Sequence, residues 1–193
     1  MILLKIYKQT ILICLLNFAV FFAMELAERN YEHFRLFFSV WTFKSGLFSP
    51  YQLITYQFVH INFSHLLLNM LFLSFLAGMI ERKFKRNLIF DYVFFGVIGG
   101  LFHLHFDYLN LPMVGASGSV FGFTALYLLS SGKNLLNNIY NKSFLIILVG
   151  IELWNIYIGD KDLIAHWCHV GGAIAGLIIW LTTLKITKND VEI

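Results

Sequence analysis

Three short polar clusters carry the side chains of this sequence that could do chemistry. Each cluster lies in an otherwise apolar stretch, and polar groups inside apolar spans are costly enough to be functional candidates. In chain order they are His60-Ile-Asn-Phe-Ser-His65-Leu-Leu-Leu-Asn69, Gly115-Ala-Ser117-Gly118 and His166-Trp-Cys-His169-Val-Gly-Gly172. The residue types are a hydroxyl, several imidazoles and an amide, which together suit acyl transfer.

The hydroxyl and an imidazole together could perform nucleophilic catalysis. A serine is a weak nucleophile until a base removes its proton, and imidazole is the usual base because it titrates near neutral pH. Ser117 is therefore the candidate nucleophile and His169 the candidate base, although His166 rivals it by spacing alone. No acidic residue is clearly placed to complete a triad, because Glu152 falls near the middle of an expected span. The sequence thus predicts a Ser–His dyad.

The first cluster could stabilise the oxyanion that acyl transfer creates. Such an oxyanion needs hydrogen-bond donors aimed at it. His65 and Asn69 are four residues apart, so they share one helix face, and they could act with backbone N–H groups near the nucleophile. Gly115 and Gly118 would let the backbone turn sharply and let a substrate carbonyl approach.

Composition decides what kind of molecule must position these groups. The chain has 193 residues, of which 59% are hydrophobic and only 13% charged, against about 25% charged in soluble domains. This excludes a disordered chain and argues against a soluble domain. Because one span takes about 20 residues, the length allows six or seven spans and no sizeable extramembrane domain. The net charge of +3 is too small and too scattered to indicate nucleic-acid binding.

The apolar segments predict an all-α membrane protein, a single domain over 1–193 with six transmembrane helices. An aromatic-rich stretch over 28–52 is expected to lie at the membrane interface. Ten of the 14 Lys and Arg residues would share one side with the N-terminus, which predicts cytoplasmic termini in a multi-pass protein. The compact six-span form favours the cell (inner) membrane, with an organelle membrane as the alternative. The spans are expected at about 10–26, 57–80, 87–106, 113–130, 143–158 and 163–184.

This topology places the three clusters at similar depth. Spans two, four and six would all begin at the outer face. At about 1.5 Å per residue, Ser117 lies about 6 Å and His169 about 9 Å below that face, with His65 and Asn69 at about 10 to 20 Å. Three helices therefore contribute to one expected site within the bilayer.

Small-residue stripes would let two of these helices approach closely. Gly118 and Gly122 form one G-x-x-x-G pattern, and Gly172 and Gly176 form another. His169 lies just above the second stripe and the nucleophile is adjacent to the first. Packing the stripes together would bring the hydroxyl near the imidazole.

Together these motifs resemble the rhomboid family of intramembrane serine proteases, in its six-span bacterial form. The resemblance runs from about Pro50 to Trp180 and rests on H-x(4)-H-x(3)-N, G-x-S-G and H-x-G-G-x(3)-G in this order. It implies a six-helix bundle with a water-filled cavity open to the outside, and single-span membrane proteins as substrates, cut near the membrane surface. The roles it implies are Ser117 as nucleophile, His169 as general base, His65 and Asn69 in the oxyanion hole, and His60 in support of the cavity and the first outer loop.

Two positions depart from the pattern of better-known bacterial members. Gln52 stands where an Arg is often seen in the first loop. Phe121 stands where a Tyr often packs under the catalytic His, so the ring is kept and the hydroxyl is lost. Neither change removes a reacting group, and we expect them to affect rate and loop stability.

Two other readings of the sequence use the same residues differently. A catalytically inactive relative would bind and escort transmembrane segments without cutting them. A metal site or metal permease would use His60, His65, His166 and His169, but two imidazoles per helix with an amide make a poor closed site. We expect no metal and no cofactor. Glu152 is expected to make hydrogen bonds between helices, and His166 to serve in the polar cavity.

Overall fold

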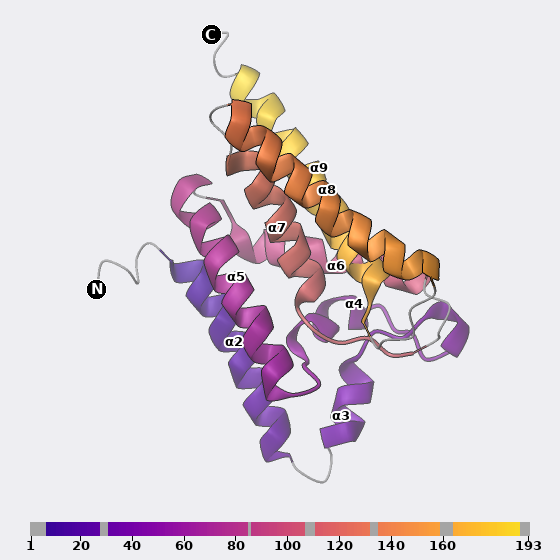
Figure 1. The fold of residues 1–193 in the computed structure, drawn as a ribbon. Helices are drawn as coiled ribbons and strands as arrows, with labels where there is room; N and C mark the ends of the chain where they lie inside the picture. Colours follow the sequence, from indigo (N-terminus) through magenta and orange to yellow (C-terminus); the bar gives the residue numbers. More distant parts are fainter. Residues whose placement is uncertain are drawn as a thin grey trace.

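The fold is a bundle of helices, several of them long enough to cross a bilayer (Figure 1). The computed structural model describes residues 7–27, 31–84, 86–106, 111–131, 135–158 and 164–189. Within these ranges the long helices are α2 (Lys8–Leu26), α5 (Phe63–Phe84), α6 (Leu88–Phe106), α7 (Ser117–Ser131), α8 (Leu135–Ile158) and α9 (His166–Asn189). The described residues form no named strand, and their one isolated bridge joins Val40 to Met113.

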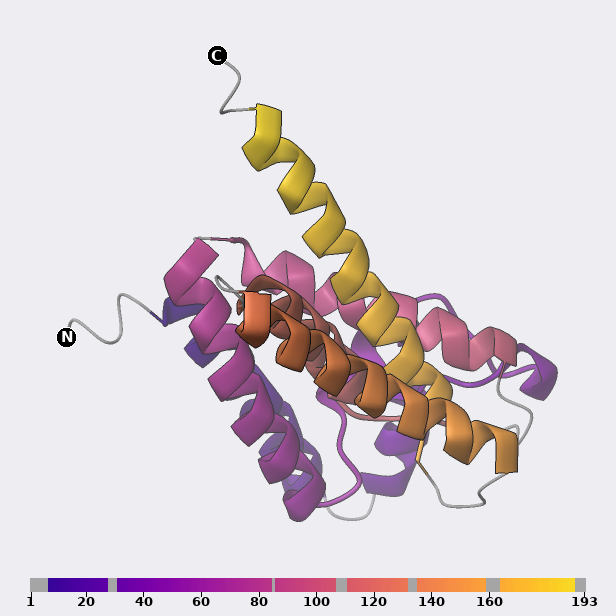
Figure 2. The ribbon, with the colours of Figure 1, turned by 45° about the horizontal axis from the view of Figure 1, so that its top comes forward.

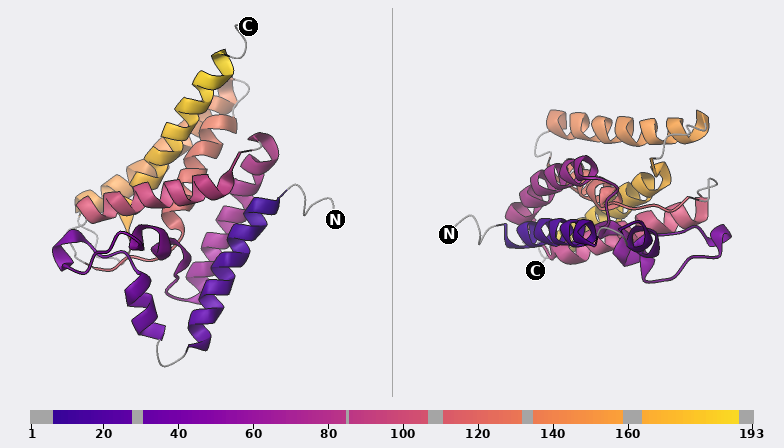
Figure 3. Two further views of the ribbon diagram at one scale, coloured as in Figure 1. Left: turned by 180° about the vertical axis from the view of Figure 1, so that it is seen from behind. Right: turned by 90° about the horizontal axis from the view of Figure 1, so that it is seen from below.

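The connection between α2 and α5 is built from short helices. In chain order these are α3 (Tyr31–Phe38), η2 (Phe43–Ser45), α4 (Gln52–Thr55) and η3 (Tyr56–Phe58). They lie at the end of the bundle where α5 and α7 begin, and part of the connection projects to one side (Figures 1 and 3). This is the aromatic-rich stretch that the composition assigns to the membrane interface.

The outer surface of the bundle is apolar. Leu68, Phe72 and Phe75 on α5 and Trp154 on α8 are each more than half exposed. Exposed apolar area on this scale is unfavourable in water and is the expected surface of a protein solvated by lipid. The helices α2, α5 and α6 are long and apolar enough to span a membrane, and α7, α8 and α9 contain shorter apolar stretches. The prediction of a helical, multi-pass membrane protein is confirmed.

Helix α7 lies at the centre and packs most closely against α9. Here the two glycine stripes lie face to face. A Cβ added to Gly172 would overlap the carbonyl oxygen of Gly118, and one added to Gly176 would overlap that of Gly122. The backbones are therefore in direct contact, as small-residue faces permit. Helix α8 lies at the margin against α7 and α9, and α9 extends past the other helices toward the C-terminus (Figures 2 and 3).

Two helices begin six or more residues away from the starts expected for their spans. Helix α5 begins at Phe63 because residues 56–58 form a 3-10 turn and Val59 is extended, after which the Asn62 side chain accepts the His65 N–H at 2.8 Å. Helix α8 begins at Leu135, eight residues before the apolar stretch, so it also includes the Asn-rich residues that the sequence assigns to a link. The links over 107–110 and 159–163, including the start of the sixth expected span, lie outside the described residues.

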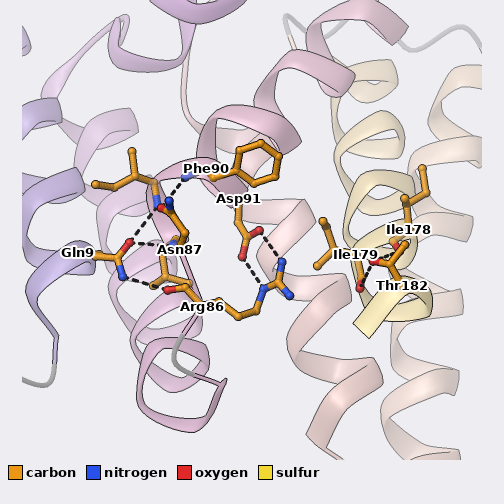
Figure 4. A network of polar contacts seen from close by, with 10 residues as sticks. Gln9, Arg86, Asn87, Phe90, Asp91, Ile178, Ile179 and Thr182 are labelled. Carbon is orange, nitrogen blue, oxygen red and sulfur yellow. Dashed lines mark hydrogen bonds and ion pairs between the residues drawn. The ribbon is translucent and has the colours of Figure 1, made fainter. Parts of the chain in front are cut away.

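At the end of the bundle away from α5's first turn, side chains join α2 to the start of α6 (Figure 4). Gln9 donates to the Arg86 carbonyl at 2.9 Å and accepts from the Leu88 N–H at 2.9 Å. Arg86 donates to both oxygens of the fully buried Asp91, at 2.8 and 2.9 Å. Asn87 accepts the Phe90 N–H at 3.1 Å and caps α6.

A second carboxylate at this end connects α2 to α5. Glu81 accepts the backbone N–H groups of Gln9 and Thr10 at 2.8 and 3.0 Å, and the Thr10 hydroxyl at 2.7 Å. A carboxylate at a helix N-terminus is favoured by the helix dipole and by the N–H groups that have no partner within the helix. We call the contacts of Gln9, Thr10, Glu81, Arg86, Asn87 and Asp91 the loop-end clamp.

Candidate active site

Ser117 is the first residue of α7 and follows an unusual turn. Gly115 has φ +119°, which L side chains rarely adopt, and a Cβ there would approach the His65 ring to 2.7 Å. The turn is held because the Gly115 N–H donates to the Tyr56 carbonyl at 2.9 Å. Glycine is therefore required twice at this position, once by the backbone conformation and once by the neighbouring ring. The turn delivers a half-buried Ser117 to the N-terminus of α7.

Four of the predicted site residues meet in one cavity. Its volume is about 600 Å³, and its lining includes Ser117, His169, His65 and Asn69, from α7, α9 and α5. Arg35, from the first connection, also borders it. The structure thus brings together the hydroxyl, two of the imidazoles and the amide, although they are up to 104 residues apart in sequence. Gly118 begins the α7 stripe beside the cavity, whereas Gly122, Gly172 and Gly176 serve the packing of helices.

His169 is held by an aromatic ring. Its imidazole is stacked on Phe121, with ring centroids 4.2 Å apart and planes 5° from parallel. Phe121 lies one helical turn after Ser117 on α7, so the nucleophile's helix also fixes the plane of the candidate base. The packing that a Tyr ring would supply is kept without its hydroxyl.

Glu152 lies beside both histidines of α9. One carboxylate oxygen of Glu152 is 2.5 Å from Nδ1 of His166 and 3.2 Å from Nδ1 of His169. The two imidazoles are perpendicular, with centroids 6.3 Å apart. The sequence reasoning missed this proximity by placing Glu152 at mid-span. A depth count would have found it, since Glu152 is six residues, or about 9 Å, from the end of α8, the depth assigned to His169.

The same three side chains are the group best suited to hold a metal ion in the described part of the chain. One ligand-type atom from each of Glu152, His166 and His169 lies within 4.8 Å of the others. Nδ1 of His166 is hydrogen-bonded to the carboxylate and Nδ1 of His169 lies within ion-pair distance of it, so we interpret the group as a network of polar contacts. The expectation of no metal stays a prediction.

His60 and His65 support the turn before the candidate nucleophile. Their ring centroids are 5.1 Å apart, and His60 Nε2 accepts the Ala116 N–H at 3.4 Å. His60 precedes α5, and burial, with His65 nearby, lowers its pKa to about 3. The ring is therefore neutral and can accept this hydrogen bond. Asn69 is buried and donates to the His65 carbonyl, one turn back, at 2.9 Å.

Gln52 organises the first connection. Its side-chain oxygen accepts the Ser49 N–H at 3.1 Å, and its amide donates to the carbonyls of Leu47 and Phe37 at 3.3 and 3.4 Å. The residue is buried. A neutral amide thus makes the backbone contacts that fold this connection.

Comparison with known proteins gives the family. The model of the Rhomboid domain matches residues 47–186. Over 142 residues the chain is 30% identical to the rhomboid protease GlpG of Haemophilus influenzae, covering 72% of both proteins. It is also similar to two proteins of Arabidopsis thaliana: RHOMBOID-like protein 12, mitochondrial (27% identity, 88% of this chain), and Rhomboid-like protein 11, chloroplastic (30%, 68%). The chain spans only 56% and 52% of their respective lengths. The resemblance seen in the motifs is confirmed, and the chain belongs to the rhomboid family.

Proposed function

We propose that the protein is an intramembrane serine endopeptidase that cleaves transmembrane segments of other membrane proteins. The observation that carries this proposal is that Ser117 and His169 line the same cavity in an otherwise apolar bundle. Further support comes from similarity to a relative named as a protease. Polar and ionisable groups are costly inside a membrane protein, so a cavity with a hydroxyl and two imidazoles indicates a functional site.

In the proposed reaction His169 takes the proton of Ser117 while Oγ attacks the substrate carbonyl. The oxyanion of the tetrahedral intermediate is stabilised by backbone N–H groups at the start of α7, with His65 and Asn69 as further donors. His169 then protonates the leaving amine and the peptide bond breaks. Water, deprotonated by the same imidazole, hydrolyses the acyl-enzyme and restores the serine.

The substrates we propose are single-span membrane proteins in a lipid bilayer. The charge distribution supports cytoplasmic termini in the cell (inner) membrane, with the Ser117 end of the bundle at the outer face. A substrate segment would then be cut near the outer surface. A cavity bordered by Arg35 and the first connection suits a chain that enters from that side.

The test is a cleavage assay in proteoliposomes with a panel of single-span proteins. We expect Ser117→Ala and His169→Ala each to lower the cleavage rate about 1,000-fold or more, because removing either group disables the nucleophile. Ser74→Ala and His105→Ala are matched controls, since both side chains are exposed and neither lines the cavity. Wild-type cleavage by Ser117→Ala would overturn the assignment.

Labelling with a fluorophosphonate probe separates the protease from an inactive relative. The protease should be labelled stoichiometrically at Ser117, and the label should disappear in Ser117→Ala. An unlabelled protein that still crosslinks to transmembrane segments would instead be a binder or escort.

A further inference from the structure

Glu152 is an acidic side chain in α8, at the lipid-facing margin of the bundle. Its neighbours Ile151, Leu153 and Trp154 are 45% to 61% exposed, whereas the Glu152 side chain is only 12% exposed and turns toward α9. A carboxylate in this setting is costly unless it is paired. Its partners are the two imidazoles of α9, so the cost is offset only by contacts with the candidate base and its neighbour.

The contact with His169 is made through a particular nitrogen. The carboxylate oxygen lies 3.2 Å from Nδ1, which is an ion-pair distance without the alignment of a hydrogen bond. When Nδ1 carries the ring proton and faces the carboxylate, the lone pair of the neutral imidazole resides on Nε2. A general base needs that lone pair directed at the nucleophile, so the choice of tautomer decides whether His169 can act.

Stacking on Phe121 fixes the plane of the His169 ring but does not decide between the two flip states of the imidazole in that plane. A flip of the imidazole within its plane would exchange the positions of nitrogen and carbon atoms without losing the stack. The carboxylate removes this ambiguity because only one flip state presents Nδ1 to it. His166 contributes by contacting the same oxygen at 2.5 Å, one turn earlier on α9, and so holds the Glu152 side chain in place.

We propose that Glu152 is a positioning residue for His169, so that the dyad works as a Ser117–His169–Glu152 triad. This inference rests on the proposed protease function. The carboxylate selects the Nδ1–H tautomer and stabilises the imidazolium that forms when His169 takes the Ser117 proton. It accepts no proton itself and forms no covalent bond.

The kinetic test compares Glu152→Gln and Glu152→Leu with Glu81→Gln. Glutamine keeps the shape of the side chain, and leucine suits a lipid-facing helix, so at least one variant should insert normally. We expect kcat to fall about 100-fold with KM within about twofold, because the lost interaction acts in the transition state. Glu81→Gln removes a carboxylate from the loop-end clamp and should leave kcat of the folded protein unchanged.

A second readout does not depend on activity. Nitrogen NMR of histidine-labelled protein, assigned with His169→Gln, distinguishes the two neutral tautomers. Wild type should show His169 protonated on Nδ1, and Glu152→Leu should shift the population toward Nε2–H. A wild-type protein that neither cleaves nor labels would refute the protease proposal, while the tautomer would still report on the contact. Either an unchanged kcat or an unchanged tautomer in Glu152→Leu would overturn the positioning role.

Discussion

Buried and half-buried carboxylates at the two ends of the bundle are partnered in different ways. In the loop-end clamp, Asp91 receives two hydrogen bonds from a guanidinium, and Glu81 receives three from the first residues of α2. In the site, Glu152 contacts two imidazoles with one oxygen. Guanidinium and backbone N–H groups never release their protons near neutral pH, whereas an imidazole does. The first arrangement can only hold helices together, and the second can also take part in proton transfer.

This contrast predicts that stability and rate can be changed separately, and the largest effect on stability is expected in the clamp. Asp91→Asn leaves Arg86 without its anionic partner. The loss should destabilise the protein by about 2 kcal/mol, less than for a fully buried pair because the Arg86 side chain is 23% exposed to solvent. Unfolding in mixed detergent measures it, and kcat per folded molecule should stay within about twofold of wild type.

The double variant Arg86→Met with Asp91→Leu serves as the control for that experiment. It removes both charges together and should recover much of the lost stability. If Asp91→Asn had a normal melting temperature and a tenfold lower kcat, the clamp would affect catalysis rather than stability, and the contrast between the two ends would be wrong.

The next effect concerns the ring beneath the candidate base. Phe121→Ala removes the stack that fixes the plane of His169, so kcat should fall about tenfold with little change in KM. Phe121→Tyr should cleave at close to the wild-type rate. As a matched control, Phe123→Ala deletes a fully buried ring of the same helix and should lower the melting temperature but not kcat. Equal kcat losses in the two alanine variants would contradict a specific role for the stack.

The smallest effect is a pH dependence of stability that arises at His60. The pKa of this ring is about 3 in the folded protein and about 6.5 when unfolded, so the unfolded state binds the proton first as pH falls. The stability present above pH 6.5 is therefore lost progressively between pH 6.5 and 3, by about 0.8 kcal/mol at pH 6. In His60→Asn the melting temperature should depend less on pH over this range. A pH dependence equal to that of the wild type would contradict the prediction.

Much of this molecule could be predicted from its sequence because the signals were local. The apolar helices, and the sharp glycine turn before Ser117, follow from residue types at short spacing. The agreement in depth of Ser117, His65 and His169 extended this to a site, since helix rise converts residue number to distance. The same arithmetic was not applied to Glu152, so its proximity to His169 went unpredicted.

Other features depend on geometry that a sequence does not encode locally. The 3-10 turn before α5 and the bonds of Gln52 arise from tertiary contacts that override the apolar pattern. The assignment of the base to His169 over His166 needed the family motif, since both imidazoles share one helix end. The stack on Phe121 needed the rotation of two helices relative to each other, which spacing alone does not give.

The contact between the glycine stripes has a consequence for the entropy of catalysis. Ser117 and His169 stand on α7 and α9, whose backbones touch through Gly118 and Gly172 without side chains between them. A backbone contact has no rotamers to freeze, so the separation of the two helices is the same in every molecule at little conformational cost. The spacing of the two helices that carry the proposed dyad is thus set when the bundle folds, before any substrate arrives.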